Sequence, residues 1–268
     1  MKIAIVGCGN MGLIYARAFL KYKIIAKEDL LLLAKSEARK KELEQLDCGI
    51  AEVLGSKQSF ESDLVILCVK PQDFGSVVNP LKEILNEKNI LISIMAGMKI
   101  EKIASALNHF NIVRAMPNSP AELGMGMTAF TSSRNLSFEQ IRKAENILST
   151  TGRTVYFENE ELLDAATALS GSGPAYFFYL VKNMMDAGKQ MGFDEATSAL
   201  LVKQTMLGSY HLLNTSAKSP DELIRTVASK GGTTEAAFKT FNQWQVGERM
   251  QEGILKACDR AKELSQSL

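Results

Sequence analysis

The chain of 268 residues is poor in histidine, with only His109 and His211, and it contains a single tryptophan and six prolines. A metal site built from three histidines is therefore excluded, and a histidine-dependent catalytic triad would have to use one of these two residues. We expect His109, which precedes a predicted strand, to be a polar surface residue. We expect His211, inside a predicted helix, to serve packing or a partner contact rather than catalysis.

An excess of one charge is also missing. Lysine and arginine number 31 and aspartate and glutamate 30, which leaves a formal net charge of +1. This balance gives no electrostatic reason to expect binding of nucleic acid or of an anionic membrane. The four cysteines form no C-x-x-C pair, and no apolar run approaches the roughly 18 residues of a membrane helix. We therefore expect reduced thiols and a cytoplasmic protein.

Hydrophobic residues make up 46% of the chain and charged residues 23%, as in ordinary globular proteins. Up to about residue 160, short continuous apolar runs alternate with longer amphipathic segments. Strands are predicted at 3–6, 30–33, 64–69, 90–95, 111–115, 127–131 and 154–157, and helices at 11–22, 36–46, 77–85, 101–107 and 138–148. This alternation predicts an α/β Rossmann-like fold with a mainly parallel sheet covered on both faces.

Beyond residue 160 the strand signal stops. Helices are predicted at 161–169, 174–192, 195–213, 220–228, 233–242 and 246–265. We therefore expect two domains, an α/β domain over residues 1–160 and an all-helical domain over residues 161–268.

The first predicted strand runs into the pattern G-x-G-x-x-G, formed by Gly7, Cys8, Gly9, Asn10, Met11 and Gly12. In this pattern the first glycine permits a tight turn, the second lets a pyrophosphate approach the backbone, and the third lets the following helix pack on the strand. The start of that helix offers free N–H groups to phosphate oxygens. Dinucleotide binding by this turn is strongly favoured over a purely structural glycine turn, because the pattern lies inside a βαβ unit.

The tip of the second strand bears on the choice of dinucleotide. A site that prefers NAD usually carries a carboxylate about 20 positions after the glycines. Here that place is occupied by Ala34, Lys35 and Ser36, with Arg39 one turn later. A cation and a hydroxyl suit a 2′-phosphate, so we expect NADP(H) to be preferred, with NAD(H) possible. The alternative is that Lys35 and Arg39 are simply solvated helix charges.

Three further strand ends carry candidate binding residues. Because ligands of open α/β sheets bind at the carboxyl edge, we expect these segments to form one rim for cofactor and substrate, although each alone could be an ordinary loop. The segments are Val69-Lys70-Pro71-Gln72, Met95-Ala96-Gly97-Met98 and Met116-Pro117-Asn118-Ser119-Pro120.

The helical half contains two turns rich in small residues, at 170–176 and 229–235. In the first, Ser172 or Gly173 is placed to cap a helix, and the turn serves either close packing or backbone approach to a ligand. In the second, Gly231 and Gly232 precede two threonines and a helix start. This arrangement is equally consistent with a backbone nest for a carboxylate and with an ordinary capped helix that has Glu235 in its first turn.

Taken together, the motifs resemble those of the Δ1-pyrroline-5-carboxylate reductase family over the whole chain and in the same order. The matching segments are GCGNMG at 7–12, VKPQ at 69–72, MAG at 95–97, RAMPNSP at 114–120, LSGSGPAY at 169–176 and VASKGGTTEAAF at 227–238. Two positions depart from the family pattern: Lys230 stands where many members carry proline, and Cys8 stands where a small residue such as alanine is more usual.

The resemblance implies reduction of Δ1-pyrroline-5-carboxylate to L-proline by hydride from NAD(P)H, the last step of proline biosynthesis. It implies a homodimer or higher oligomer, paired through the helical domain, with active sites completed at the dimer interface. Thr234 would hydrogen-bond the ring nitrogen of the substrate as the catalytic residue. The implied substrate-binding residues are Ser229, Gly231, Gly232, Thr233, Met116, Asn118 and Ser172, and the implied cofactor contacts beyond the glycine turn, Lys35 and Ser36 are Val69, Lys70, Pro71, Ala96, Gly97 and Pro117.

Two other functions are compatible with parts of the pattern. A hydroxyacid dehydrogenase with a Rossmann domain and a helical domain would use a catalytic lysine, for which Lys182 or Lys189 would serve. A non-catalytic NADP-sensing protein would keep the glycine turn and need no polar substrate nest.

Overall fold

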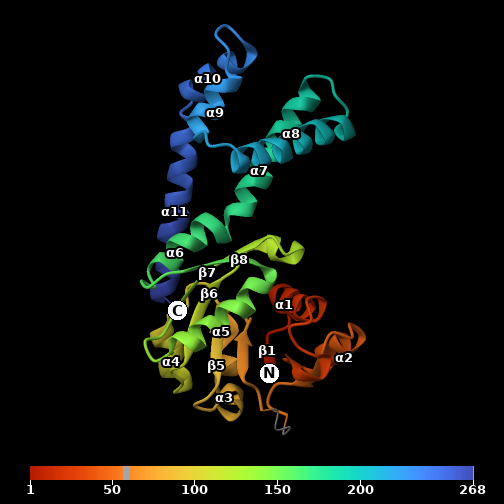
Figure 1. Ribbon diagram of the computed structural model, residues 1–268, viewed down its shortest axis with the longest axis vertical. Helices are drawn as coiled ribbons and strands as arrows, with labels where there is room; N and C mark the ends of the chain where they lie inside the picture. The colour runs from red at the N-terminus through yellow and green to blue at the C-terminus, as the bar shows by residue number, and fades with distance from the viewer. Residues whose placement is uncertain (57–60, 268) are drawn as a thin grey trace. The chain divides into compact units, whose positions relative to one another are not determined.

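The computed structural model describes residues 1–56 and 61–267 (Figure 1). The chain divides into two compact units: Met1–Ser172 together with the chain from Ala257 onward, and Gly173–Lys256. The change of unit at Gly173 lies after the predicted domain division at residue 160.

The first unit is built on one sheet. Its strands are β1 (Ile3–Val6), β2 (Leu30–Ala34), β3 (Ile50–Val53), β4 (Leu64–Leu67), β5 (Ile90–Ser93), β6 (Ile112–Met116), β7 (Gly126–Ser132) and β8 (Gly152–Tyr156). Its helices are α1 (Asn10–Lys21), α2 (Glu37–Gln45), α3 (Phe74–Ile84), α4 (Ile100–Leu107), α5 (Phe138–Leu148) and α6 (Leu162–Ala166), followed by a π-helix (Thr167–Gly171).

The strands form an eight-stranded sheet in the order β3-β2-β1-β4-β5-β6-β7-β8. Strands β1 to β6 pair in parallel, β7 runs antiparallel to β6, and β8 runs parallel to β7. The predicted Rossmann-like, mainly parallel sheet is confirmed. The carboxyl ends of β1, β2, β4, β5 and β6 therefore lie at one edge, where ligands of such sheets bind.

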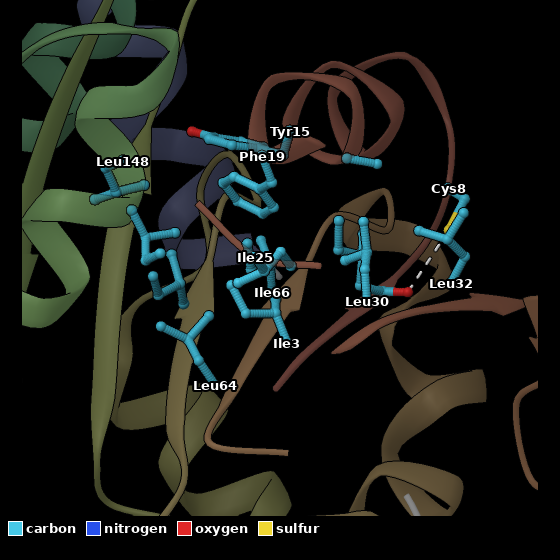
Figure 2. Close-up of a cluster of buried hydrophobic side chains, with 14 of the residues drawn as sticks. Ile3, Cys8, Tyr15, Phe19, Ile25, Leu30, Leu32, Leu64, Ile66 and Leu148 are labelled. Carbon is cyan, nitrogen blue, oxygen red and sulfur yellow. Dashed lines mark hydrogen bonds between the residues drawn. The ribbon is translucent and has the colours of Figure 1, made fainter. Parts of the chain in front are cut away.

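Both faces of this sheet are buried, which explains why its central strands read as continuous apolar runs. Ile3 and Ile5 of β1 belong to the core on one face, and Ala4 and Val6 belong to the core on the other. Figure 2 shows the first of these cores, where Tyr15 and Phe19 of α1 lie over the side chains of β1, β2 and β4. The packing of α1 on this face fixes the direction of the turn that precedes it.

One strand was missed, and the expected surface position of His109 was wrong. The edge strand β3 was not predicted, because it is short and half-exposed and has no continuous apolar run. His109 is buried rather than on the surface, and it directly follows Asn108, which ends α4 in the left-handed conformation. Burial lowers the pKa of His109, so the neutral imidazole is favoured there.

The second unit is helical, with α7 (Gly173–Gln190), α8 (Glu195–Thr215), α9 (Pro220–Val227), α10 (Thr233–Gln243) and most of α11 (Val246–Ser267). Many large apolar side chains on its helices are exposed in the single chain, among them Phe178, Leu200, Leu207 and Tyr210. Apolar surface on this scale marks a face that another protein surface covers. In the part of the chain that the structure describes, no helix is long and apolar enough to cross a membrane.

Candidate functional site

The three glycines of the turn after β1 differ in what an added side chain would meet. Gly7 adopts a φ of +91°, and a Cβ atom there would lie 2.7 Å from the backbone nitrogen of Val69. A Cβ on Gly12 would lie 2.6 Å from the carbonyl oxygen of Gly7, so this glycine lets α1 approach β1. A Cβ on Gly9 would meet nothing within 4 Å. The turn therefore leaves open space only at the glycine assigned to the pyrophosphate.

Helix α1 begins at Asn10 without a side-chain cap on its N-terminus. The first N–H groups of the helix, at Asn10, Met11 and Gly12, therefore receive no acceptor from a capping side chain, and the helix dipole places partial positive charge there. An uncapped helix start beside an open glycine is a suitable site for a phosphate group.

The tip of β2 brings cationic and hydroxyl groups close to this turn. Ser36 caps α2, and its Oγ accepts a hydrogen bond from the backbone N–H of Arg39. The guanidinium of Arg39 reaches back across the sheet edge, where Nη2 donates to the carbonyl oxygen of Cys8 at 2.6 Å. Lys35 is exposed beside it. The sequence pattern included Arg39 but could not predict its contact with the glycine turn.

Cys8, inside the turn, is a buried thiol rather than a reactive one. Burial raises its pKa to about 12. Cys8 is therefore protonated at neutral pH. Because the thiolate is the nucleophilic form, this thiol is unreactive there.

The next two strand ends differ in their surroundings. Val69 lies against the glycine turn, while Lys70 is exposed and precedes a short 3₁₀ helix that begins at Pro71. After β5, Ala96 is half-buried and Gly97 adopts a φ of +71°. A Cβ on Gly97 would lie 3.2 Å from the backbone of Leu264, so this glycine is closely packed against the end of α11.

The loop after β6 meets the π-helix. The side-chain amide of Asn118 donates from Nδ2 to the carbonyl oxygen of Ser170 at 3.1 Å, and its Oδ1 accepts from the backbone N–H of Met127 at 2.8 Å. The side chain of Met116 lies 3.6 Å from the position of a Cβ on Gly171. Two segments that were predicted separately are therefore brought together: the loop of Met116 and Asn118 and the turn that contains Ser172. π-helical turns are frequent at functional sites.

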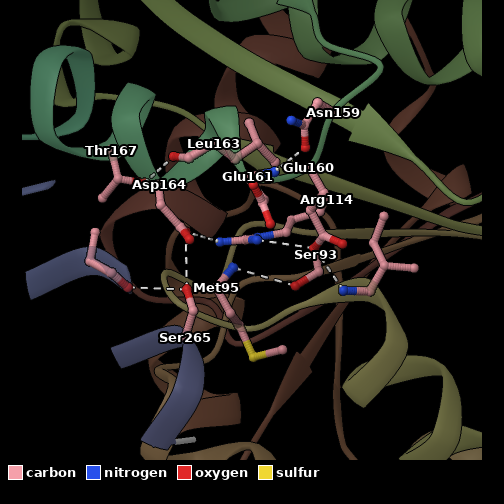
Figure 3. A network of polar contacts seen from close by, with 12 residues as sticks. Ser93, Met95, Arg114, Asn159, Glu160, Glu161, Leu163, Asp164, Thr167 and Ser265 are labelled. Atoms are coloured by element: carbon pink, nitrogen blue, oxygen red, sulfur yellow. Dashed lines mark hydrogen bonds and ion pairs between the residues drawn. The ribbon is translucent and has the colours of Figure 1, made fainter. Parts of the chain in front are cut away.

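A buried ion network lies below this loop and was not predicted (Figure 3). Arg114 of β6 has a side chain only 1% exposed. It donates to Glu160 at 3.0 Å and to Asp164 at 2.8 Å, and the hydroxyl of Ser265 in α11 donates to the same Asp164 oxygen. The network ties β6 to α6 and to the end of α11. A charged residue inside the apolar run of a predicted strand was the signal that could have revealed it.

The glycine loop of the second unit is partly closed by its own contacts. Gly231 adopts a φ of +73°, and its N–H donates to the carboxylate of Glu235 at 2.5 Å. The N–H of Gly232 donates to the carbonyl oxygen of Ser229 at 3.0 Å. Helix α10 then begins at Thr233 with no side-chain cap from Gly232. The N–H groups of Thr233 and Thr234 thus lie at the uncapped end of this helix.

The two candidate lysines of the dehydrogenase alternative form an exposed ion cluster. Lys182 and Lys189 each lie 2.7 Å from a carboxylate oxygen of Asp186. This contact raises the pKa of Lys189, and the two lysines lower the pKa of Asp186 to about 2. A lysine that acts as a base needs a lowered pKa, so this cluster does not suit that role.

Comparison with known families gives matches to both parts of the chain. The profile of pyrroline-5-carboxylate reductase dimerisation matches residues 160–264, and that of the coenzyme F420-dependent NADP oxidoreductases matches residues 2–97. The pyrroline-5-carboxylate reductase of Aquifex aeolicus is 36% identical over 98% of this chain and 97% of its own length. That of Pseudomonas aeruginosa is 32% identical over 100% and 98%, respectively.

Solved structures agree with these relatives. The pyrroline carboxylate reductase of Plasmodium falciparum, crystallised with NADP bound, superposes with a TM-score of 0.88 at 27% identity, covering 99% of this chain and 98% of that one. Prephenate dehydrogenase from A. aeolicus superposes with a TM-score of 0.57 at 14% identity, a likeness of fold alone.

Proposed function

The chain belongs to the pyrroline-5-carboxylate reductase family, and on that premise we propose that it reduces Δ1-pyrroline-5-carboxylate to L-proline with hydride from NAD(P)H. The observation that carries the proposal is the 36% identity to a pyrroline-5-carboxylate reductase over nearly the full length of both chains. The glycine turn with its open Gly9 supports the nucleotide half of the reaction.

NADP(H) is the proposed cofactor, with NAD(H) as a possible substitute. The residues present fit its phosphates: an open glycine, an uncapped helix start and cationic groups after β2. We assign the pyrophosphate to Gly7, Gly9, Asn10, Met11 and Gly12, and the adenosine end to Lys35 and Ser36. The nicotinamide end is assigned to Val69, Lys70, Pro71, Ala96, Gly97 and Pro117. When bound, the nicotinamide supplies the hydride.

The substrate is held by its carboxylate and by its ring nitrogen. We assign the carboxylate to Ser229, Gly231, Gly232 and Thr233, which lie at the start of α10. Since the N–H groups of Gly231 and Gly232 already have acceptors in the chain, the N–H groups of Thr233 and Thr234 are the donors that the uncapped helix start offers directly. Met116, Asn118 and Ser172 are assigned to the ring.

The protein contributes orientation rather than proton chemistry. The imine carbon accepts hydride most readily when the ring nitrogen is protonated or hydrogen-bonded. The hydroxyl of Thr234 holds that nitrogen but is a poor acid, so the proton arrives with the iminium or from solvent. Carboxylate and nitrogen contacts together fix which face of the ring is presented.

We further propose a division of labour between residues 1–160, which bind the nucleotide, and residues 161–268, which pair subunits and bind substrate. Active sites are then completed at the dimer interface. The exposed apolar side chains of α7 and α8 support pairing. The free cysteines suit a cytoplasmic protein.

The test is spectrophotometric oxidation of NADPH by the purified protein on addition of Δ1-pyrroline-5-carboxylate, beside a panel of 2-hydroxy acids assayed with NADP⁺. Turnover with the imine alone is expected. Turnover with a hydroxy acid alone would favour the dehydrogenase alternative. NADPH binding without any turnover would favour a nucleotide sensor.

A further inference from the structure

We propose that Arg39 is the residue that recognises the 2′-phosphate of NADP(H), and that it does so while anchored to the glycine turn through the carbonyl oxygen of Cys8. The proposal rests on the nucleotide-binding half of the proposed function. It assigns to one side chain both the choice of NADP(H) over NAD(H) and part of the shape of the pyrophosphate turn.

The geometry places the guanidinium between two segments far apart in sequence. Arg39 stands in the first turn of α2, and Nη2 donates to the carbonyl oxygen of Cys8 at 2.6 Å. Its side chain is 33% exposed, so it is held by the protein yet reachable from solvent. The backbone N–H of Arg39 also donates to Ser36, which fixes the base of the side chain at the tip of β2.

The position has the chemistry that a 2′-phosphate requires. In a Rossmann unit the ribose of the adenosine lies between the glycine turn and the tip of the second strand, which are the two segments that Arg39 joins. A guanidinium has five N–H donors in a fixed planar fork, which matches a phosphate in two parallel bonds. The bonds to Cys8 and Glu42 leave it able to donate further.

The carboxylate of Glu42 is a competitor of the 2′-phosphate for the Arg39 guanidinium. Nη1 of Arg39 lies 2.5 Å from a carboxylate oxygen of Glu42, which is one turn later on α2 and largely exposed. An incoming phosphate dianion would compete with this carboxylate for the same guanidinium. Glu42 therefore weakens the affinity for the 2′-phosphate, and its removal strengthens it.

The experiment is isothermal titration calorimetry of the full-length protein with 2′,5′-ADP and, separately, with 5′-ADP, which lacks the 2′-phosphate. The variants are Arg39→Gln, Arg39→Lys and Glu42→Gln. The matched control is Lys41→Gln, which removes one positive charge from an exposed position of the same helix. Thermal unfolding of each variant establishes that it is folded.

Arg39→Gln is expected to lower the affinity for 2′,5′-ADP about tenfold or more, because a charge-assisted pair of hydrogen bonds is lost. It should lower the affinity for 5′-ADP only about twofold, because the glycine turn is held less firmly. Arg39→Lys should recover part of the 2′,5′-ADP affinity, since it keeps the charge and loses the fork. Glu42→Gln should raise the affinity for 2′,5′-ADP and leave the affinity for 5′-ADP unchanged. Lys41→Gln should change either affinity less than about twofold.

Equal weakening of both nucleotides by Arg39→Gln would overturn the proposal, because the residue would then serve only the turn. The proposal would also be overturned if Lys41→Gln lowered the affinity for 2′,5′-ADP as much as Arg39→Gln does. A wild-type protein that binds 5′-ADP more tightly than 2′,5′-ADP would overturn it too, and would point to a carboxylate such as Glu37 at the ribose. These outcomes concern nucleotide binding alone. Failure of the wild-type protein to reduce the imine would instead count against the proposed reaction.

Discussion

At the scale of single residues, the glycine turn offers a matched pair of alanine substitutions. Gly9→Ala places a methyl group in open space with an allowed extended backbone, so the free energy of unfolding should be nearly unchanged while NADPH affinity falls. Gly12→Ala drives a methyl group to 2.6 Å from the carbonyl oxygen of Gly7, so the fold itself should lose stability. Thermal unfolding and NADPH fluorescence titration measure the two effects separately.

The two variants are controls for each other. A large loss of stability from Gly9→Ala, or none from Gly12→Ala, would contradict the roles read from the geometry. The turn would then be held together by something other than these close approaches.

Thr234 is the residue on which the proposed chemistry depends most directly. Thr234→Ala removes the hydroxyl assigned to the ring nitrogen and should lower kcat/KM roughly tenfold to a hundredfold, the size of one lost hydrogen bond to a charged partner. Thr234→Ser keeps the hydroxyl and should stay within a few-fold of wild type. Steady-state kinetics with saturating NADPH measure both, and an alanine variant with wild-type kcat/KM would remove Thr234 from the mechanism.

Burial of the Cys8 thiol predicts that the free energy of unfolding falls at alkaline pH. Its folded-state pKa is about 12 against an ordinary value of 9.0, so the folded protein keeps a thiol proton that the unfolded chain loses. This contribution is complete below pH 9 and is lost as the pH rises toward 12, at up to about 1.4 kcal/mol per pH unit. Cys8→Ala should flatten the fall in unfolding free energy between pH 9 and pH 10.5. Urea unfolding at several pH values tests this, and parallel pH profiles would contradict it.

At the scale of elements, the ion network around Arg114 links β6 to α6 and to α11. Arg114→Met leaves the Asp164 side chain, 5% exposed, without its guanidinium partner. An unpaired buried carboxylate is costly, so the free energy of unfolding should fall by about 3–5 kcal/mol. Urea unfolding at one fixed protein concentration measures this loss.

The double variant Arg114→Met, Asp164→Leu is the control. It replaces the buried pair by apolar side chains and should recover much of the stability, because the penalty comes from the charge left behind. If the double variant is as unstable as the single one, the network acts through the shape of Arg114 rather than through its charge.

These same elements show how far the sequence alone could lead. The central strands were predictable because both sheet faces are buried, which leaves runs such as LVIL in β4 with no polar interruption. Strand β3 was not predictable, because an edge strand needs only half its residues buried and therefore shows no continuous apolar run. The π-helix at Thr167–Gly171 was not predicted: residues 167–169 were expected to be ordinary helix and residues 170–171 to begin a turn, because one extra residue in a helical turn leaves apolar spacing almost unchanged.

The site follows the same rule. The tight turn at Gly7 and the close packing at Gly12 could be predicted because they follow from the local G-x-G-x-x-G spacing, whereas the approach of Val69 to Gly7 could not. The bonds from Arg39 to Cys8 and from Arg114 to Asp164 join residues 31 and 50 positions apart, and no local pattern records such a pairing. Sequence therefore indicates where the turns lie, but it does not show which side chains join them.

At the scale of the whole molecule, the net charge of +1 means that no general field attracts the anionic cofactor and substrate. On the proposed assignments their charges would be met locally, by the uncapped starts of α1 and α10 and by the cations after β2. These groups belong to two different compact units. The reaction requires nucleotide and substrate to meet, and pairing of subunits is the proposed means.

Heterodimers of two impaired subunits can test this arrangement. One subunit carries Thr234→Ala and keeps its nucleotide turn, and the other carries Gly9→Asp, whose carboxylate repels phosphate, and keeps Thr234. If Thr234 of one subunit serves the nucleotide bound by the other, each heterodimer has one intact site and one doubly damaged site. Co-expression with two different affinity tags and purification on both should then restore about half of the wild-type activity per dimer.

If each site is built within one subunit, every site in the heterodimer carries one damaging substitution, and activity should stay at the level of the two parent variants. The parents, purified in the same way, set that baseline, and gel filtration with light scattering establishes that all samples are the same oligomer. Recovery in the mixed dimer alone is the result that a site shared between subunits requires, because neither substitution can repair the other within one chain.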